Sequence, residues 1–343
     1  MAAVLVGGVG SPLLLRSVRH RHCLSGRRNR PTLFFSRTRT ATAASSAAVS
    51  VQTRPGGDVP GGKARTGMDI LACPICYNPL TTICTVGPNE VTGLECGNCK
   101  KAYAREEAFL DLTVSSGSKE YSVAMPASTE LFRSPLVSFL YERGWRQNFI
   151  FGGFPGPEKE FEMAKEYLNP TLGGTVVDAS CGSGMFSRLF ASSKLYSLVV
   201  ALDFSENMLR QCNDFVNEEG IPRENLVLVR ADVSRLPFVS SSVNAVHAGA
   251  ALHCWPSPSA AVAEISRILR PGGVFVATTF IVDGIFMFLP FLKALRQYYT
   301  SSTGQHLYFS AGELEDLCTT CGLVGFKCVR NGSFVMLSAT KPS

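Results

Sequence analysis

The stretch that most constrains the fold of this chain runs from Thr175 to Phe186 and reads T-V-V-D-A-S-C-G-S-G-M-F. An apolar run ends in an acidic residue, two close glycines follow, and the next residues have the spacing of an amphipathic helix. This order places backbone N–H groups and a carboxylate at the carboxyl end of a buried strand, where doubly wound sheets hold nucleotides. The same pattern also suits a tight turn that binds no ligand, so the rest of the chain must decide.

Helical and extended segments alternate from Glu158 onwards. The apolar runs predict five strands, at 175–179, 198–202, 226–229, 243–249 and 273–280. Alternation with helices builds a parallel sheet that is covered on both faces. Near the end of the chain, Asn331-Gly332 is a two-residue hairpin signal and predicts two antiparallel strands. The expected fold is therefore an α/β, Rossmann-like sheet of seven strands with an antiparallel hairpin at its end.

Aspartates stand at the ends of the first three predicted strands. Asp178 and Asp203 close the first and second strands, 25 residues apart, and Asp232 follows the third. Carboxyl ends of parallel strands meet at one rim of a sheet, and a carboxylate there can accept two ribose hydroxyls. Each aspartate also suits a cap or a turn. Three of them after consecutive strands indicate a shared ligand.

Four of the twelve cysteines form two pairs, Cys73-Pro-Ile-Cys76 and Cys96-Gly-Asn-Cys99, with 19 residues between them. Without an export signal, so many cysteines favour a reducing compartment and metal-bound or free thiols. Two such pairs predict a closed tetrahedral zinc site with a structural role in a module at 66–115 that is too small for its own core. The alternative is four free or disulfide-forming thiols.

A third pair, Cys318 and Cys321, lies on the apolar face of a predicted helix that ends at Gly322. A redox pair is one reading of this spacing. Packing in the core explains the same positions, because small thiols bury well, and we favour that interpretation.

The amino-terminal 65 residues differ in charge from the rest of the chain. They contain 11 Lys or Arg and one acid, Asp58, which leaves 22 basic and 26 acidic residues, a net charge of −4, in the remainder. Few acids with much Arg, Ser, Thr and Ala predict an organelle transit peptide at 1–65. The Ala/Ser/Thr run favours the chloroplast, with the mitochondrion or a nucleic-acid-binding tail as alternatives. No run of the sequence reaches the length of a membrane-spanning helix.

Residues 116–157 are expected to form a linker and a helical lid. A helix is predicted from Glu130 to Phe149, with Pro135 in its first turn, followed by N-F-I-F-G-G-F-P-G-P. An aromatic loop with glycine hinges can close over a site and exclude water. It can equally be an ordinary connector with a few buried phenylalanines.

Five motifs resemble those of class I S-adenosylmethionine-dependent methyltransferases in order and separation: D-A-S-C-G-S-G, A-L-D-F-S-E-N-M-L, A-D-V-S-R-L-P-F, A-V-H-A-G-A-A-L-H-C-W-P and I-L-R-P-G-G-V-F-V. The resemblance covers Glu158 to Lys341 and implies a methyltransferase domain at 158–343. Within this family, the sequence is similar to the methyltransferases of ubiquinone and menaquinone biosynthesis, and in particular to plant plastid methyltransferases with an amino-terminal zinc ribbon. In one departure, Ser180 stands where the family usually has its first glycine.

The resemblance implies a site for S-adenosylmethionine. The turn beside Asp178 would receive the amino and carboxylate end of the cofactor, Asp203 the ribose, and Asp232 with the backbone of Val233 the adenine. The complete set of implied cofactor-binding residues is Asp178, Ser180, Cys181, Gly182, Gly184, Asp203, Phe204, Met208, Asp232 and Val233.

Methyl transfer from a sulfonium releases a neutral group, so in-line positioning and exclusion of water are the main requirements. His253 follows the fourth strand and is the candidate catalytic base or donor, with packing as the alternative. Trp255 is a candidate for stacking on a planar acceptor or for a buried anchor. His247, inside a strand, is expected to be structural.

The segment 283–299 is apolar and aromatic and follows the fifth strand. In this architecture it covers the active site, which favours a small apolar acceptor, such as a prenyl quinone or other plastid lipid, over a simple core helix. It also suits peripheral contact with a thylakoid membrane or a lipid particle such as a plastoglobule; otherwise the enzyme is expected in the stroma.

Two alternative functions remain. The ribbon-plus-methyltransferase arrangement also resembles bacterial ribosomal-RNA guanine methyltransferases. RNA or DNA partners are disfavoured by the net charge of −4, because phosphate contacts need clustered Lys and Arg. The second alternative, a non-catalytic cofactor-binding module, is disfavoured by the three intact aspartates.

Overall fold

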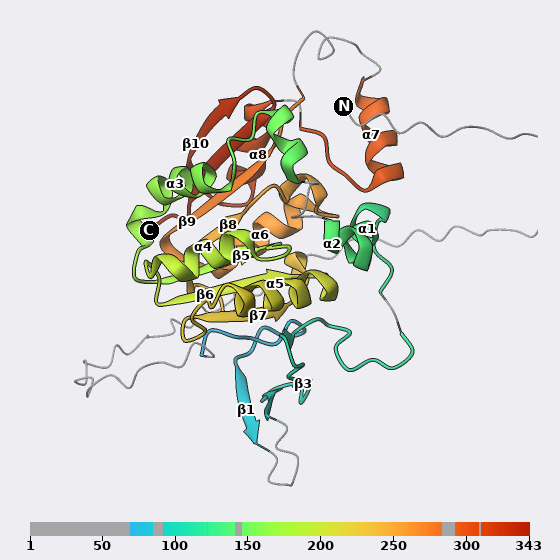
Figure 1. The fold of residues 1–343 in the computed structure, drawn as a ribbon, viewed down its shortest axis with the longest axis vertical. Coiled ribbons are helices and arrows are strands. Elements are labelled where there is room, and N and C mark those ends of the chain that lie inside the picture. The colour runs from blue at the N-terminus through green and yellow to red at the C-terminus, as the bar shows by residue number, and fades with distance from the viewer. Residues whose placement is uncertain (1–68, 85–91, 122, 141–145, 283–291, 309) are drawn as a thin grey trace, which may run out of the picture. The chain divides into compact units, whose positions relative to one another are not determined.

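The structure, a computed structural model, describes residues 69–84, 92–121, 123–140, 146–282, 292–308 and 310–343 (Figure 1). These residues belong to one compact unit, Gly61–Ser343. The predicted transit peptide and the first part of the apolar segment, 283–291, lie outside the described residues.

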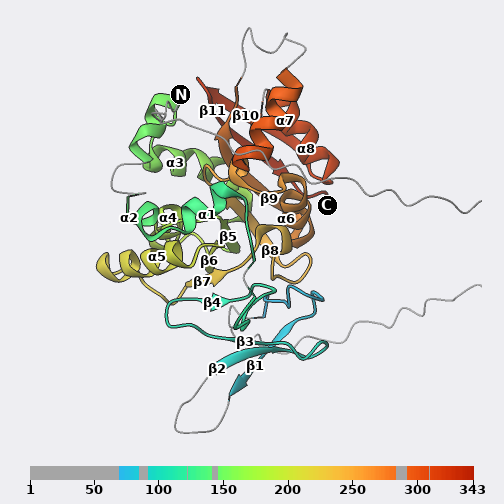
Figure 2. The ribbon, with the colours of Figure 1, turned by 90° about the vertical axis from the view of Figure 1, so that its right-hand side faces the viewer.

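An eight-stranded sheet organises the chain, in the order β10-β11-β9-β8-β5-β6-β7-β4 (Figure 2). The strands β4 to β9 run parallel, and β11 pairs antiparallel with both β9 and β10. The bounds are β4 (Leu110–Asp111), β5 (Thr175–Ala179), β6 (Leu198–Asp203), β7 (Leu226–Arg230), β8 (Val243–Ala248), β9 (Leu269–Phe280), β10 (Val324–Asn331) and β11 (Phe334–Thr340).

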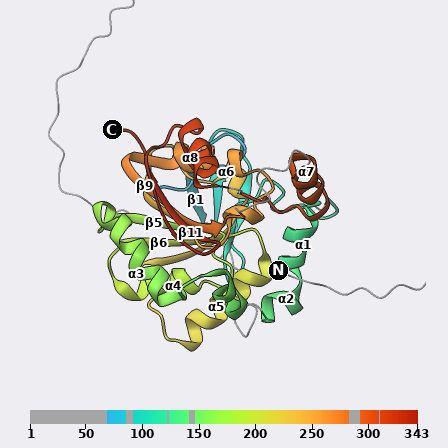
Figure 3. The same ribbon diagram turned by 90° about the horizontal axis from the view of Figure 1, so that it is seen from above.

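Helices cover both faces of this sheet (Figure 3). One face carries α3 (Pro157–Leu168), α4 (Met185–Ser193) and α5 (Glu206–Glu218); the other carries α6 (Pro258–Ile268) and α8 (Ala311–Thr320). Because side chains alternate along a strand, neighbours enter different cores: Val176 packs with Phe190 under α4, and Val177 packs with Ile265 under α6. This two-sided burial explains the continuous apolar runs in the strands.

The seven predicted strands are all present, and most of their bounds differ by one or two residues. The fifth strand, β9, begins four residues early, at Leu269, because the Pro-Gly-Gly segment pairs irregularly beside β8. The buried face of α5 consists of Met208, Leu209, Cys212 and Val216. Val216 is buried there, whereas Phe215 is partly exposed and lies under the guanidinium of Arg188, 4.8 Å from its ring centroid.

A separate antiparallel sheet of β1 (Leu80–Cys84), β2 (Thr92–Cys96) and β3 (Ala102–Ala104) carries the two cysteine pairs. Residues 69–104 are called the ribbon below. Within the module predicted at 66–115, β3 closes the ribbon sheet, whereas β4 pairs with β7 of the large sheet.

The strand β4 is therefore an eighth strand that the sequence did not predict. Its Asp111 accepts a hydrogen bond from Arg230 of β7 at 2.9 Å, and Arg230 also pairs with Glu206 of α5 at 2.8 Å. These buried or partly buried ion pairs fix the segment after the ribbon to the edge of the large sheet.

The helix predicted from Glu130 to Phe149 is wrong in its continuity. Two short helices, α1 (Ala127–Arg133) and α2 (Pro135–Leu140), take its place, followed after 141–145 by the 3₁₀ helix η2 (Arg146–Gly152). Ser134 is extended, as expected for a residue before a proline, and Pro135 begins the second helix.

The aromatic loop is a packed connector. The ring of Phe154 is buried, with its centroid 4.7 Å from those of both Phe280 and Phe334. Gly153 is needed for this path, because a Cβ there would lie 2.2 Å from the carbonyl oxygen of Asn331. Phe151 is the exception, since 92% of it is exposed.

Among the described residues, the helices all fall short of the length and apolar character that crossing a bilayer requires.

Candidate functional site

A pocket opens at the carboxyl ends of β5, β6, β7 and β8. Sheets of this type place ligands at this edge. The lining is mostly apolar: Met125, Thr129, Phe132, Ser180, Gly182, Asp203, Phe204, Ser205, Met208, Ala231, Asp232, Val233, Gly249, Ala250, Ala251, Cys254, Trp255 and Pro256.

The turn after β5 forms one wall of the pocket. Ser180 occupies the left-handed region, with φ +60°, and Gly182 follows at φ +57°. The glycine that the family usually has at this position would adopt this conformation without strain. For a serine the left-handed conformation costs roughly 1 kcal/mol of conformational energy. The indole Nε1 of Trp255 donates to Ser180 Oγ at 2.9 Å and holds the serine in place.

Asp203 joins this turn to the second strand. Its Oδ2 accepts from the backbone N–H of Gly182 at 2.9 Å, and its Oδ1 accepts from that of Ser205 at 2.8 Å. Burial raises the pKa of the Asp203 carboxyl, and the backbone donors oppose this effect. A partly desolvated carboxylate at the pocket wall binds hydroxyl donors strongly.

Asp232 begins the 3₁₀ helix η4 (Val233–Arg235). Its Oδ1 accepts from the backbone N–H of Ser234 at 2.8 Å. Asp232 and Val233 both line the pocket, so the two predicted adenine-binding residues face the same space as Asp203.

Asp178, which the sequence predicted to bind the cofactor, does not line the pocket. The strand period places Asp178 on the face of Val176, under α4, where it is 1% exposed. Ser187 Oγ donates to its Oδ2 at 2.6 Å, and Nδ1 of His247 lies 2.8 Å from its Oδ1. Asp178 therefore supports the turn from behind, and His247 is structural, as expected.

Two other predicted residues also lie outside the pocket lining. Cys181 donates its backbone N–H to the Leu202 carbonyl at 3.0 Å, which fixes the turn against β6. Gly184 begins α4 at φ +84°, and a Cβ there would lie 2.2 Å from Cys212 Sγ. The glycine is therefore required for close packing of α4 on α5.

The predicted catalytic residues occupy different surroundings. Trp255 lines the pocket but is 3% exposed, which fits the buried anchor better than free stacking. His253 does not line the pocket; its Nδ1 lies 3.1 Å from Thr279 Oγ1, and its ring packs edge-on against Phe280 at 5.1 Å. Burial lowers the pKa of His253 to about 4, so the ring is neutral at physiological pH.

Part of the segment 116–157 also lines the pocket; the sequence predicted a helical lid there but singled out none of its residues as pocket residues. Met125, Thr129 and Phe132 line it from above the strand ends. Two hydrogen bonds hold α1 over α5: Ser205 Oγ donates to the Phe132 carbonyl at 3.0 Å, and Asn207 Nδ2 donates to the Arg133 carbonyl at 2.6 Å. Both links join residues more than 70 positions apart, so no local spacing could reveal them.

Comparison with known proteins decides the family. A methyltransferase-domain family matches residues 177–277. The Arabidopsis thaliana chloroplastic methyltransferase At1g78140 is 67% identical over 290 residues, which cover 82% of this chain and 81% of that protein. This chain belongs to the class I S-adenosylmethionine-dependent methyltransferases. It is an enzyme that uses S-adenosylmethionine as methyl donor.

Two more distant proteins are also similar. The demethylmenaquinone methyltransferase of Desulfitobacterium hafniense is 27% identical over 193 residues, covering 52% of this chain and 66% of that protein. The solved structure of Haemonchus contortus phosphoethanolamine N-methyltransferase 2 in complex with S-adenosyl-L-methionine aligns with a TM-score of 0.51 and 17% identity, over 65% of this chain and 62% of that one. The latter likeness supports the fold of the methyltransferase.

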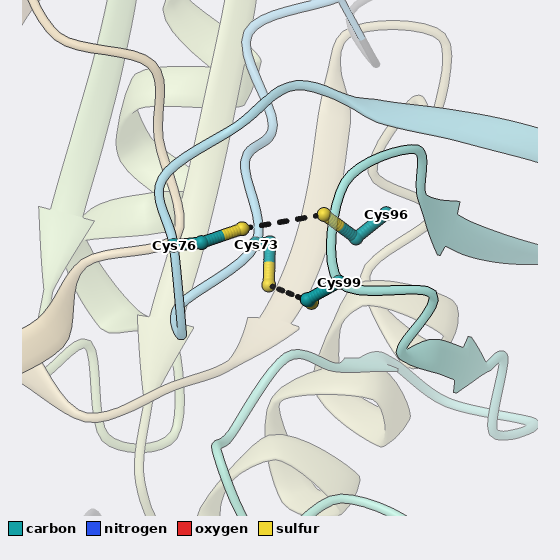
Figure 4. Close-up of side chains that lie close together, drawn as sticks. All are labelled: Cys73, Cys76, Cys96 and Cys99. Atoms are coloured by element: carbon teal, nitrogen blue, oxygen red, sulfur yellow. Dashed lines mark hydrogen bonds between the residues drawn. The ribbon is translucent and has the colours of Figure 1, made fainter.

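The four paired cysteines of the methyltransferase converge in the ribbon (Figure 4). All four Sγ atoms lie within 4.8 Å of one another, with Cys73 and Cys99 3.5 Å apart and Cys76 and Cys96 3.4 Å apart. Tetrahedral zinc with Zn–S bonds of about 2.3 Å separates its sulfurs by roughly 3.8 Å. The donor set and its spacing therefore fit zinc.

The two cysteine turns have the same backbone design. Tyr77 and Lys100 each follow the second cysteine of a pair, and each has φ near +60°. The N–H of Tyr77 donates to the Cys73 carbonyl at 2.8 Å, and that of Lys100 to the Cys96 carbonyl at 3.0 Å. Two matching turns that present thiolates to one point are typical of a closed structural metal site.

Proposed function

We propose that this methyltransferase acts in the chloroplast on a small apolar acceptor such as a prenyl quinone or another lipid. The observation that carries the proposal is the two-sided pocket: Asp203 and Asp232 stand at the strand ends, and the apolar side chains of Met125 and Phe132 cover them. S-adenosylmethionine supplies an electrophilic methyl group, and an apolar, water-poor cover favours its transfer to an apolar molecule.

Exposed apolar side chains on α1, which lines the pocket, and on three further helical segments support this class of acceptor. They lie on α1, α2, η2 and α7 (Leu292–Thr303), and α1 contacts both α2 and α7. These side chains are at least 43% exposed: Leu131, Leu136, Phe139, Leu140, Ile150, Phe151, Leu295 and Tyr298. Exposure of this size suits a lipid surface, such as a thylakoid or a plastoglobule, better than a core helix.

The similarity to a demethylmenaquinone methyltransferase supports a quinone-like acceptor. The chloroplast assignment is supported by the relative At1g78140, which is named chloroplastic, and by the Arg- and Ser-rich leader. In the proposed mechanism Asp203 would hold the ribose, Asp232 the adenine, and the turn at Ser180, supported by Trp255, the amino and carboxylate end of the cofactor. In-line positioning of the acceptor would supply most of the rate of the transfer.

We further propose that the four cysteines hold a structural zinc ion. Four thiolates close the coordination sphere, so the metal would stabilise the ribbon and would leave no position for a substrate.

The function is tested by incubating the protein with methyl-labelled S-adenosylmethionine and plastid extract, followed by separation into organic, aqueous and RNA fractions. Label in the organic fraction is expected. Asp203→Ala is the control, because it removes the carboxylate that joins the turn to the ribose site, and it should reduce labelling at least 100-fold. Label in RNA would instead support base methylation, and cofactor binding without labelling of any fraction would support a non-catalytic module.

A further inference from the structure

One segment of the methyltransferase, residues 232–239, has two neighbours. Its first residues, Asp232 and Val233, line the cofactor pocket. Its later residues contact the ribbon: the N–H of Ala72 donates to the Pro237 carbonyl at 2.8 Å, and the N–H of Val239 donates to the Ile70 carbonyl at 2.9 Å. The segment is therefore shared between the pocket and the metal-binding module.

Apolar burial strengthens this contact. Leu71 of the ribbon forms an antiparallel bridge with Phe238. The two residues are 2% and 0% exposed, and both belong to the core cluster that also contains Cys73 and Cys96. Burial of these two large side chains stabilises the contact.

Arg235 links the end of η4 directly to the first cysteine turn. Its Nε donates to the Pro74 carbonyl at 2.8 Å, and its Nη2 donates to the Ile75 carbonyl at 3.1 Å. Pro74 and Ile75 are the two residues between Cys73 and Cys76. The Arg235 guanidinium can bond to both carbonyls only when the turn between Cys73 and Cys76 keeps this conformation. A metal ion bound by Cys73 and Cys76 would hold the turn in it.

A second arginine, on α6, also donates hydrogen bonds to this segment. Arg267 of α6 donates to the carbonyls of Leu236 and Phe238, both at 2.8 Å, and its guanidinium lies 4.1 Å from the ring centroid of Tyr77. Tyr77 directly follows Cys76. The cysteine turn, α6 and residues 235–238 therefore form one connected polar network.

Any displacement of Arg235 reaches Asp232 through a single helical turn. The N–H of Arg235 donates to the Asp232 carbonyl at 2.9 Å, and that of Ser234 donates to the Asp232 carboxylate at 2.8 Å. The position of the Asp232 carboxylate is thus coupled to the cysteine turn.

We propose that Arg235 and the first cysteine turn position the adenine-binding residues Asp232 and Val233, so that metal occupancy of the ribbon sets how well the enzyme recognises the adenine of its cofactor. The inference rests on the proposed cofactor site. Arg235 is a positioning residue, since it lines no part of the pocket and acts through η4.

The test is calorimetric binding of S-adenosylhomocysteine and of its inosine analogue, S-inosylhomocysteine, which lacks the exocyclic amine. The wild-type protein should prefer the adenosine compound by about 10-fold or more, because Asp232 accepts from that amine. In Arg235→Gln the affinity for the adenosine compound should fall about 5–20-fold and the preference should shrink to within about threefold. Arg235→Lys, which keeps one donor, should lie between the two.

Removal of the metal tests the same proposal independently of any substitution. Wild-type protein treated with a chelator should lose the same preference, and added Zn²⁺ should restore it, while Arg235→Gln keeps its zinc as measured by elemental analysis. Arg223→Gln is the matched control, because Arg223 bonds to Asn213 and Asn217 of α5 away from the ribbon, and its preference should equal that of the wild type.

The outcomes separate the two proposals. An unchanged preference in both Arg235→Gln and the metal-free protein would overturn the inference and leave the proposed function intact. A wild-type protein that binds neither compound would instead remove the proposed cofactor site.

Discussion

The two sheets of this methyltransferase are stabilised in different ways. In the large sheet, β6 and β11 each have a single residue that is not buried, and two apolar cores enclose the strands. In the ribbon, by contrast, β1 and β3 are largely open to solvent: Tyr103 is the one buried residue of the three in β3, and Thr81 and Thr82 of β1 are exposed. A sheet with so few buried side chains does not fold on apolar burial alone. We therefore expect the ribbon to depend on the proposed zinc ion and on its contact with residues 232–239.

The strongest test of this difference removes the metal ligands. In the double variant Cys73→Ser, Cys96→Ser, the zinc content should fall from about one ion per chain to nearly none, because a metal site of this kind supplies on the order of 10 kcal/mol of folding free energy. Amide hydrogen exchange should become fast in residues 69–104 and stay slow in the large sheet.

The matched control for this experiment is Cys318→Ser, Cys321→Ser. Both residues lie at the end of α8, and Cys318 is 1% exposed in the core, so this variant should lose stability but keep its zinc. A metal-free ribbon with slow exchange would contradict the assignment of the four cysteines.

The complementary test removes apolar burial from the large sheet. Phe275 of β9 is fully buried, and Phe275→Ala should lower the free energy of unfolding by about 3–5 kcal/mol in denaturant titrations, because a cavity remains. The zinc content should be unchanged. Phe151→Ala should change stability by less than about 0.5 kcal/mol, since 92% of Phe151 is exposed. Equal losses in the two variants would show that the core does not stabilise this sheet.

A smaller effect is expected from pH. Burial lowers the pKa of His253 to about 4, whereas the unfolded chain protonates this histidine near pH 6.5. Between these values the unfolded state binds more protons, so stability falls as the pH falls from about 6.5 to about 4. Between pH 7 and pH 4 the free energy of unfolding should fall by roughly 1–3 kcal/mol less in His253→Gln than in the wild type. Thermal unfolding over this pH range measures the difference. His306→Gln, at a partly exposed histidine, is the control and should retain the wild-type slope.

The smallest effect concerns helix caps. Ser205 Oγ accepts from the backbone N–H of Met208 at 3.3 Å and donates to the Phe132 carbonyl. Ser205→Ala should cost about 1 kcal/mol and weaken S-adenosylhomocysteine binding a few-fold, because α1 loses an anchor. In α8 the equivalent cap is Ser310, whose Oγ accepts from the backbone N–H of Glu313 at 3.2 Å. Ser310→Ala removes this cap. It should cost the same stability without a change in cofactor binding, and equal binding losses would show that α1 is not held by Ser205.

Local patterns in the sequence predicted much of this molecule. Continuous apolar runs located the strands of the large sheet, the Asn331-Gly332 pair predicted the hairpin that β10 and β11 form, and the two cysteine pairs predicted a site whose four sulfurs do converge. The turn after β5 was located correctly, and it forms a pocket wall, although a serine stands at its left-handed position.

Tertiary structure alone decided the direction of Asp178, the position of His253 outside the pocket lining, the cover that α1 provides and the departure of β4 from the ribbon. The sequence by itself determined which segments form strands, helices and metal-binding turns, because these depend on neighbours within a few residues. It did not determine which strand face a carboxylate shares with a distant helix, or which edge accepts a two-residue strand. Those outcomes depend on contacts such as Arg230 with Asp111, which join residues 119 positions apart.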